Sequence, residues 1–311
     1  MKVYHSLEEF EKIANGVVTI GTFDGVHVGH QKIISSLDYL AEERNGETIV
    51  LTLYPHPRMV LYPDDNDLKL ITTMDERIEL FERYGIDHLI IHPFTKEFSR
   101  LSATEFVRDI LVNKMGTKTL VIGYDHRFGR HREGTFETLE EVAPLYNFDL
   151  IEIPEQDVNN IAVSSTKIRN ALMAGDITTA NQYLGHDFEL TGTVIHGDKV
   201  GKTLGYPTAN LEIKDRYKLI PASGIYAVYV QVNDDLYKGM LYIGSRPTLN
   251  GTKQSIEVNI LDFDKDIYGK MITVALKYKV REDMKLNSIE ELKLQIDKDK
   301  AETIKLLSET Y

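Results

Sequence analysis

The sequence contains no cysteine among its 311 residues. A disulfide framework, a thiolate zinc site and a cysteine nucleophile are therefore excluded. Because disulfides belong to oxidising compartments, this absence fits a reducing environment, and we expect a cytoplasmic protein. Residues 1–16, MKVYHSLEEFEKIANG, also lack the apolar core of a signal peptide.

Long apolar runs and excess positive charge are missing as well. No apolar stretch approaches the roughly 18 residues of a membrane-spanning helix, so we expect no membrane partner. Lysine and arginine number 36 against 48 aspartate and glutamate, which gives a formal net charge of −12. A broad nucleic-acid footprint needs basic surface, so we expect no nucleic-acid partner. Small nucleotides are not excluded, because a few backbone amides and one or two cations can hold a phosphate.

The first part of the chain, 1–185, alternates short apolar runs with amphipathic stretches. The stretches 74–85 and 103–116 repeat apolar residues at helical spacing, and each follows a capping-box sequence. Strands that alternate with helices predict an α/β domain with a parallel sheet, whose ligands bind at the carboxyl ends of the strands. The predicted strands are 17–21, 48–54, 88–94, 118–124 and 150–154.

The second part, 186–311, changes to an alternation of period two between turn sequences. It is predicted to form an antiparallel β-barrel or sandwich, closed by a helix over 288–311. Within this helix we expect 293–305 to be a solvated face. The predicted strands are 224–232, 236–245, 255–263 and 270–280.

The stretch GTFDGVHVGH, residues 21–30, places three glycines and two histidines after the first predicted buried strand of the sheet. A metal site, a phosphate site and a tight turn could each use these residues. Zinc is disfavoured because cysteine is absent and no third ligand lies at a helpful spacing. The glycines permit close backbone approach, so a polyanion could reach the amides of the following helix, with His27 and His30 as further donors.

This stretch resembles the His-x-Gly-His signature of nucleotidyltransferases, which transfer a nucleotidyl group from ATP or CTP. That superfamily has a second phosphate-binding motif, and VSSTKIRNAL (163–172) fits it; alone, it would be a capped helix with two solvated cations. The resemblance assigns catalysis to His27, His30 and Arg169. It assigns ATP binding to Gly21, Phe23, Gly29, His30, Ser164, Ser165, Thr166 and Arg169.

GDKVGKT (197–203) is similar to a P-loop, but only three residues separate its glycines and a proline follows where a helix should run. The longer string LTGTVIHGDKVGKTLGYPTANLEI (190–213) instead resembles the ATP-binding segment of riboflavin kinases. GSRPTLNG (244–251) and SIEVNILDFDKDIYGK (255–270) match later motifs of that family in order.

Together the two halves resemble the bifunctional bacterial riboflavin kinase/FAD synthetase family over essentially the full length. The resemblance implies a Rossmann-like nucleotidyltransferase domain followed by a riboflavin kinase barrel. ATP would phosphorylate riboflavin to FMN in the barrel, and a second ATP would adenylylate FMN to FAD in the first domain. The expected cofactor is Mg²⁺, and the expected assembly is a monomer or weak homo-oligomer.

In the kinase domain the resemblance implies Glu257 as the base that accepts the proton of the riboflavin hydroxyl. Thr208 and Asn210 would hold Mg²⁺, which prefers oxygen ligands. Glu257 and Arg281 are assigned to riboflavin. The ATP-binding set is Gly197, Lys199, Gly201, Lys202, Pro207, Thr208 and Asn210.

For FMN in the first domain the resemblance implies Asp24, Pro55, Pro57, Tyr124, Asp125 and Phe128. Asp24 and Asp125 could equally be turn residues. Three positions depart from the family pattern: His126, where phenylalanine is usual; Lys202, where arginine is usual; and Asn259, where histidine is usual. Lys202 keeps the charge but loses the planar fork of arginine.

Two other functions are compatible with parts of the sequence. A nucleotidyltransferase for another acceptor, such as pantetheine phosphate or a lipid headgroup, leaves the second half unexplained. A flavin-binding regulator without turnover would have no need for a base at Glu257.

Overall fold

The structure is a computed structural model that describes residues 1–311 apart from 65–67, 125, 155–156, 159–160, 198–199, 249–250, 287 and 309–311. The chain divides into two compact units, Met1–Ser164 and Ser165–Tyr311. Helices α6 (Ser165–Ala174) and α7 (Ile177–Leu184) therefore group with the barrel. The domain boundary after residue 185 stays a prediction.

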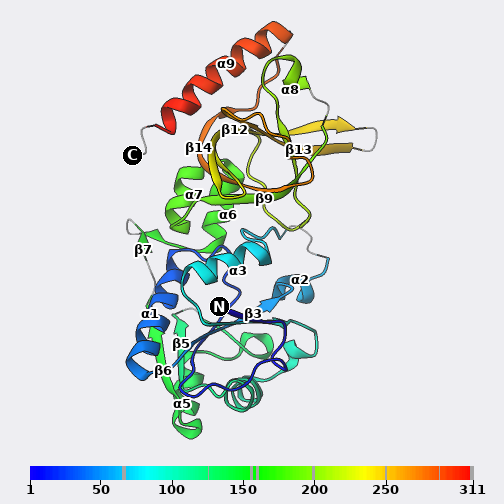
Figure 1. Cartoon of the computed structure of the whole chain (residues 1–311). Helices are drawn as coiled ribbons and strands as arrows, with labels where there is room; N and C mark the ends of the chain where they lie inside the picture. Colours follow the sequence, from blue (N-terminus) through cyan, green and yellow to red (C-terminus); the bar gives the residue numbers. More distant parts are fainter. Residues whose placement is uncertain are drawn as a thin grey trace. The chain divides into compact units, whose positions relative to one another are not determined.

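The first unit is built on a six-stranded parallel sheet in the order β1-β4-β3-β2-β5-β6 (Figure 1). All five predicted strands of this unit are confirmed, and a short edge strand, β1, joins them. The order reverses between β2 and β5, which is where doubly wound sheets bind ligands. The strands are β1 (Lys2–Tyr4), β2 (Val17–Ile20), β3 (Thr48–Tyr54), β4 (His88–Pro93), β5 (Thr119–Gly123) and β6 (Asp149–Ile153).

Both faces of this sheet are covered. Successive residues of one strand alternate between two core clusters: Val17 packs with α1 and α3, and Val18 packs with η2 and α5. The helical elements are α1 (Val28–Arg44), α2 (Pro57–Leu61), α3 (Met74–Arg83), η1 (Phe98–Arg100), α4 (Ala103–Glu105), η2 (Phe106–Lys114), η3 (Arg130–Arg132) and α5 (Phe136–Tyr146). Beyond β6 come two very short paired strands, β7 (Asp157–Val158) and β8 (Ile161–Ala162).

The helix predicted over 103–116 differs from expectation. Its capping box is present, since Ser102 and Glu105 bond reciprocally, but the chain winds as a π-helix from Phe106 to Lys114. The wider winding is visible in the bond from the amide of Met115 to the carbonyl oxygen of Ile110, 2.9 Å. Apolar spacing does not separate the two windings, because both bring one face of the segment onto the sheet.

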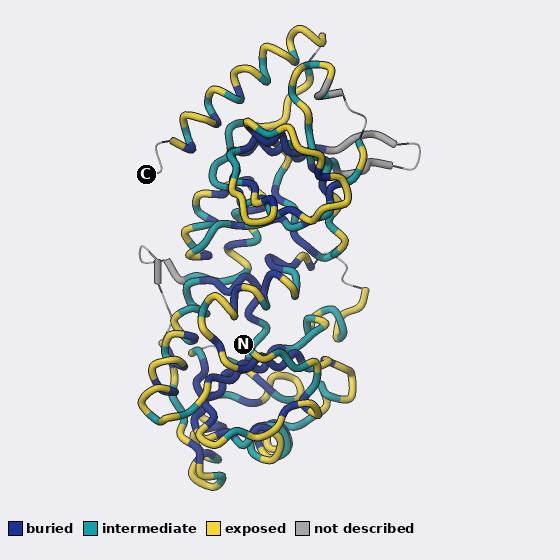
Figure 2. The backbone as a smooth tube through the Cα atoms, in the orientation of Figure 1, coloured by how far each residue is buried: buried dark blue, intermediate teal, exposed yellow. Residues whose placement is uncertain are grey.

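The second unit contains a closed antiparallel barrel in the order β10-β13-β12-β11-β14-β9. Closure decides between the barrel and the sandwich that the sequence left open. Figure 2 shows buried positions following the strands of each unit. The elements are β9 (Phe188–Ile195), α8 (Val200–Thr203), β10 (Ala209–Glu212), β11 (Gly224–Val232), β12 (Asp235–Thr248), β13 (Gly251–Ile260), β14 (Met271–Glu282) and α9 (Ile289–Leu306).

Helix α9 packs against β11, β12 and β14. The expectation that 293–305 is a solvated face is wrong for Asp299 and Thr303, which are 4% and 0% exposed. No described helix is long and apolar enough to cross a membrane.

Candidate active sites

The turn after β2 runs directly into α1 at the carboxyl edge of the sheet. His27 is the N-cap of α1, and its Nδ1 accepts a hydrogen bond of 3.4 Å from the backbone amide of His30. The two imidazole rings stack with centroids 3.6 Å apart. Phe23 packs edge-on against His30, and a Cβ on Gly21 would lie 3.0 Å from the Phe23 ring. Gly21 therefore makes room for an aromatic side chain that supports the histidine pair.

His30 is held as a neutral imidazole. Burial lowers its pKa well below the ordinary value, and the nearby charges of His27 and Arg77 lower it further. Its Nδ1 is buried without a hydrogen-bond partner. A buried polar atom left in this way is costly unless a ligand or water completes it, so the turn is suited to an incoming oxygen.

Asp24 lies in the same turn and is part of a buried ion pair. Its carboxylate accepts hydrogen bonds from the backbone amides of Ile71 and Thr72, at 3.0 and 3.1 Å. It also lies 3.4 Å from Nη2 of Arg77, and the two side chains are 1% and 2% exposed. Arg77 was not anticipated from the sequence, because it lies in an ordinary amphipathic helix. The observed role of Asp24 is thus structural, and its contact with FMN stays a prediction.

The other residues predicted to bind FMN follow β3 and β5 at the same edge of the sheet. Pro55 lies between β3 and α2, Pro57 is the first residue of α2, and Tyr124 is half exposed directly after β5. Phe128 is buried against Phe106, with ring centroids 5.5 Å apart. Asp125 lies outside the described residues, and the predicted FMN contacts stay predictions.

His126, one of the departures from the family pattern, lies three residues after β5, across the switch point from His27. Its Nε2 is buried without a hydrogen-bond partner, and its ring is roughly parallel to Phe128 with centroids 6.0 Å apart. Burial, with a smaller contribution from the charge of Arg132, lowers its pKa to about 4. His126 is therefore neutral at physiological pH.

The second predicted phosphate motif begins α6. Ser164 and Ser165 are half-buried, Thr166 is exposed, and Arg169 is half-buried on the turn that carries the buried Ile168. Ser165 opens the second unit, whereas the histidine turn belongs to the first. That both motifs bind the same triphosphate stays a prediction.

The barrel brings together the three residues expected to carry kinase chemistry. Asn210 on β10 pairs directly with Glu257 on β13. The hydroxyl of Thr208 donates to Glu257 Oε2 at 3.2 Å, and the hydroxyl of Ser255 donates to Glu257 Oε1 at 2.7 Å. Both oxygens of the carboxylate are thereby oriented by hydroxyl groups. Ser255 was not anticipated, although it lies two residues away on the same face of the strand.

Two glycines let the preceding loop approach these residues closely. A Cβ on Gly197 would lie 2.2 Å from Nδ2 of Asn210, and a Cβ on Gly201 would lie 2.3 Å from the carbonyl oxygen of Tyr206. The amide of Asn259 donates to the carbonyl oxygen of Pro207 at 2.7 Å, which gives this departure from the family pattern a structural role. Lys199 and the side chain of Lys202 lie outside the described part of the chain.

Arg281, expected near riboflavin, links β14 to α9. Its Nε and Nη2 donate to Asp299 at 2.9 and 2.8 Å, and its Nη1 donates to the carbonyl oxygen of Glu282. This two-pronged contact fixes the guanidinium against the helix. Its predicted contact with riboflavin stays a prediction.

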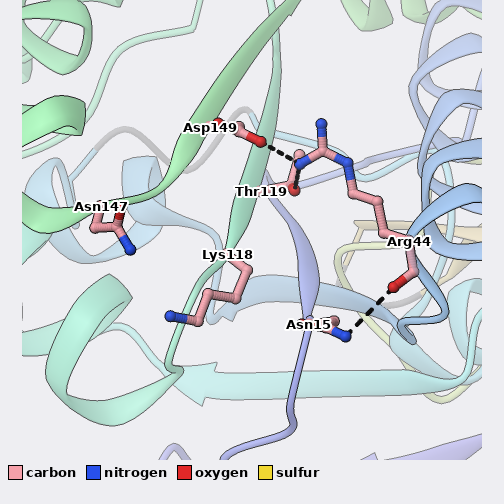
Figure 3. A pocket seen from close by; sticks show the side chains of 6 residues that line it. All are labelled: Asn15, Arg44, Lys118, Thr119, Asn147 and Asp149. Atoms are coloured by element: carbon pink, nitrogen blue, oxygen red, sulfur yellow. Dashed lines mark hydrogen bonds and ion pairs between the residues drawn. The ribbon is translucent and has the colours of Figure 1, made fainter.

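A separate pocket of about 430 Å³ opens at the opposite, amino edge of the sheet (Figure 3). Arg44 donates there to Thr119 and to Asp149, so the cation is paired within the protein. None of the residues predicted for either reaction lines this pocket. Its lining residues are Asn15, Arg44, Lys118, Thr119, Asn147 and Asp149.

Comparison with known proteins assigns a family to each part of the chain. Residues 9–167 match the FAD synthetase family and residues 184–307 match the riboflavin kinase family. The bifunctional riboflavin kinase/FMN adenylyltransferase of Bacillus subtilis (strain 168) is 37% identical over 96% of this chain and 94% of its own. That of Escherichia coli (strain K12) is 36% identical over 91% and 90%. A crystal structure of a macrolide-efflux protein from Streptococcus pneumoniae superposes with a TM-score of 0.90 at 31% identity, covering 97% of this chain and 98% of that one. The chain therefore belongs to the family of bifunctional riboflavin kinase/FMN adenylyltransferases.

Proposed function

We propose that the barrel transfers the γ-phosphoryl group of ATP to the 5′-hydroxyl of riboflavin, with Glu257 as the base. The observation that carries this assignment is the cluster of Thr208, Asn210 and Glu257 on β10 and β13. An alcohol is a weak nucleophile at neutral pH, and a carboxylate placed beside it takes its proton as attack begins. The hydroxyls of Thr208 and Ser255 hold the carboxylate in one orientation for this step.

We propose Mg²⁺ as the cofactor of the kinase site. The donor set fits the ion, since the hydroxyl of Thr208 and the amide oxygen of Asn210 are hard oxygen ligands. A hydroxyl can offer a lone pair to the ion and still donate its proton to Glu257. When bound, Mg²⁺ neutralises charge on the ATP phosphates. The described residues contain no group of three or more histidine, aspartate or glutamate side chains able to hold a metal by themselves. This is consistent with an ion held largely by substrate phosphates and water.

The first unit, in this proposal, joins FMN to the α-phosphorus of a second ATP and releases pyrophosphate. The attacking FMN phosphate is already anionic, so alignment and charge stabilisation suffice without a strong base. Nδ1 of His27 accepts a backbone amide, which places the proton of a neutral ring on Nε2 and makes that nitrogen a donor. The N-terminus of α1 adds backbone amides and the positive end of the helix dipole.

One pair of variants tests the division of labour between the two units. Protein is incubated with ATP, Mg²⁺ and either riboflavin or FMN, and flavins are separated by chromatography over time. Glu257→Gln should lower FMN formation by about 100-fold or more while FMN is still converted to FAD. His30→Ala should lower FAD formation by about 100-fold and leave riboflavin phosphorylation intact. Loss of both reactions in a folded single variant, or of neither, would refute the assignment.

A further inference from the structure

The loop that enters the kinase site, residues 201–208, is closed on itself by backbone hydrogen bonds. The amides of Leu204 and Tyr206 both donate to the carbonyl oxygen of Gly201, at 3.1 and 2.8 Å. Gly205, at φ +86°, makes the turn in open space. The backbone of the loop is thus shaped locally, but these bonds do not attach the loop to the barrel.

Two contacts fasten the end of this loop to β13. Asn259 donates to the carbonyl oxygen of Pro207, and Thr208 donates to Glu257. Both partners belong to the same strand, so this attachment lies on one side of the loop. A second attachment is needed to resist rotation of the loop about that strand.

The second attachment comes from α9. The hydroxyl of Tyr206 donates to Oδ1 of Asp297, and Nζ of Lys300 lies 5.9 Å from the centre of the Tyr206 ring. The hydrogen bond to Asp297 is the main reason that the pKa of Tyr206 is raised to about 12, so the phenol keeps its proton at physiological pH. Figure 1 shows the start of α9 near α8, whose last three residues begin this loop.

Helix α9 is itself a fixed support. Asp299, two residues beyond Asp297, is buried and accepts hydrogen bonds from the guanidinium of Arg281 on β14. At the far end of α9, the hydroxyl of Tyr229 on β11 donates to the carbonyl oxygen of Leu307 at 3.3 Å. The helix is therefore fixed to the barrel, and its Asp297 holds Tyr206 in place.

We propose that Tyr206 and Asp297 are positioning residues for riboflavin phosphorylation, holding Thr208 and Asn210 in place from α9. This inference rests on the proposed function of the kinase site. Tyr206 is two residues from Thr208, so freedom at Tyr206 reaches the hydroxyl that contacts Glu257. Phosphoryl transfer depends on alignment, and small displacements of a positioned group slow it strongly.

The test uses the full-length chain with Tyr206→Phe, Asp297→Ala and the double variant. Riboflavin phosphorylation is measured as FMN plus FAD formed, and FMN adenylylation on the same chain serves as an internal control. Tyr237→Phe is the matched control, because Tyr237 donates to Asp235 at 3.2 Å on an exposed hairpin of the same barrel. Asp297→Asn keeps an acceptor oxygen for the Tyr206 hydroxyl. Thermal unfolding of every variant verifies that the barrel stays folded.

Tyr206→Phe and Asp297→Ala should each lower kcat for phosphorylation about tenfold, as expected when a hydrogen bond to a charged group is lost at a partly exposed site. The KM for MgATP should rise more than the KM for riboflavin, FMN adenylylation should be unchanged, and Asp297→Asn should recover most of the rate. The double variant should be no slower than the slower single variant. Wild-type kinetics in Tyr206→Phe, or independent multiplying losses in the double variant, would overturn the inference. If Glu257→Gln still phosphorylates riboflavin, the proposed site itself falls, and the positioning role falls with it.

Discussion

The half-buried imidazole of His126 should make the protein less stable as the pH falls below neutrality. Its pKa is about 4 in the folded chain and 6.5 when unperturbed. Above pH 6.5 the ring is neutral in both states and contributes no pH dependence. Between pH 6.5 and 4 the unfolded chain binds a proton that the folded chain does not, so the free energy of unfolding decreases as the pH is lowered. The interval of about 2.5 pH units corresponds to about 3 kcal/mol.

Substitution by phenylalanine isolates this effect, because the ring keeps its place beside Phe128 and loses its titrating nitrogens. The free energy of unfolding is measured by urea denaturation of the wild type and His126→Phe at pH 7.5 and pH 4.5. His30 and His92 also have lowered pKa values, but they are common to both proteins and cancel in the difference. On going from pH 7.5 to pH 4.5, the wild type should lose about 2–3 kcal/mol more of its free energy of unfolding than the variant loses. A difference below about 1 kcal/mol would show that His126 is solvated or finds a proton acceptor, and would refute the reasoning.

Two further substitutions test contacts on which the sites depend. Arg77→Met should destabilise the first unit by about 3–5 kcal/mol, because it leaves the buried Asp24 carboxylate without its counterion. Urea denaturation measures this loss, and a decrease in the free energy of unfolding below about 1 kcal/mol would contradict the buried ion pair. Gly197→Ala should slow riboflavin phosphorylation at least tenfold while FMN adenylylation continues, because the added methyl group would lie 2.2 Å from the side-chain amide of Asn210. Wild-type phosphorylation kinetics in this variant would show that the loop can move aside.

The elements that the sequence predicted well are those with strong local patterns. Continuous apolar runs gave the central parallel strands, period-two alternation gave β11 to β14, and capping residues gave the starts of α3 and α4. The π-winding of η2 has no such pattern, because the segment is only nine residues long and its apolar residues also fit the spacing of an α-helix. Strand β1 is too short, at three residues, for alternation to be recognised.

The candidate sites divide in the same way. The histidine turn and the Pro207–Asn210 element are compact motifs, so their residues could be named from the sequence. The residues that hold them are distant in the chain: Asn259 lies 52 positions from Pro207, and Asp297 lies 91 positions from Tyr206. Such partners are selected by the closure of the barrel and the docking of α9, which no local pattern encodes.

A chain with a net charge of −12 must still attract nucleotides that are themselves strongly anionic. In the proposed function, the first unit meets this requirement locally, around the histidine turn. The carboxylate of Asp24 is neutralised by Arg77 and by backbone amides, and it is buried away from solvent. His30 is neutral, so binding an anion there requires no counterion to be displaced from the ring. The remaining contribution comes from the amides at the start of α1, whose dipole favours negative charge at any overall charge of the protein. Under that proposal, local geometry at this turn outweighs the acidic composition, because charges farther than about 10 Å away are screened by salt.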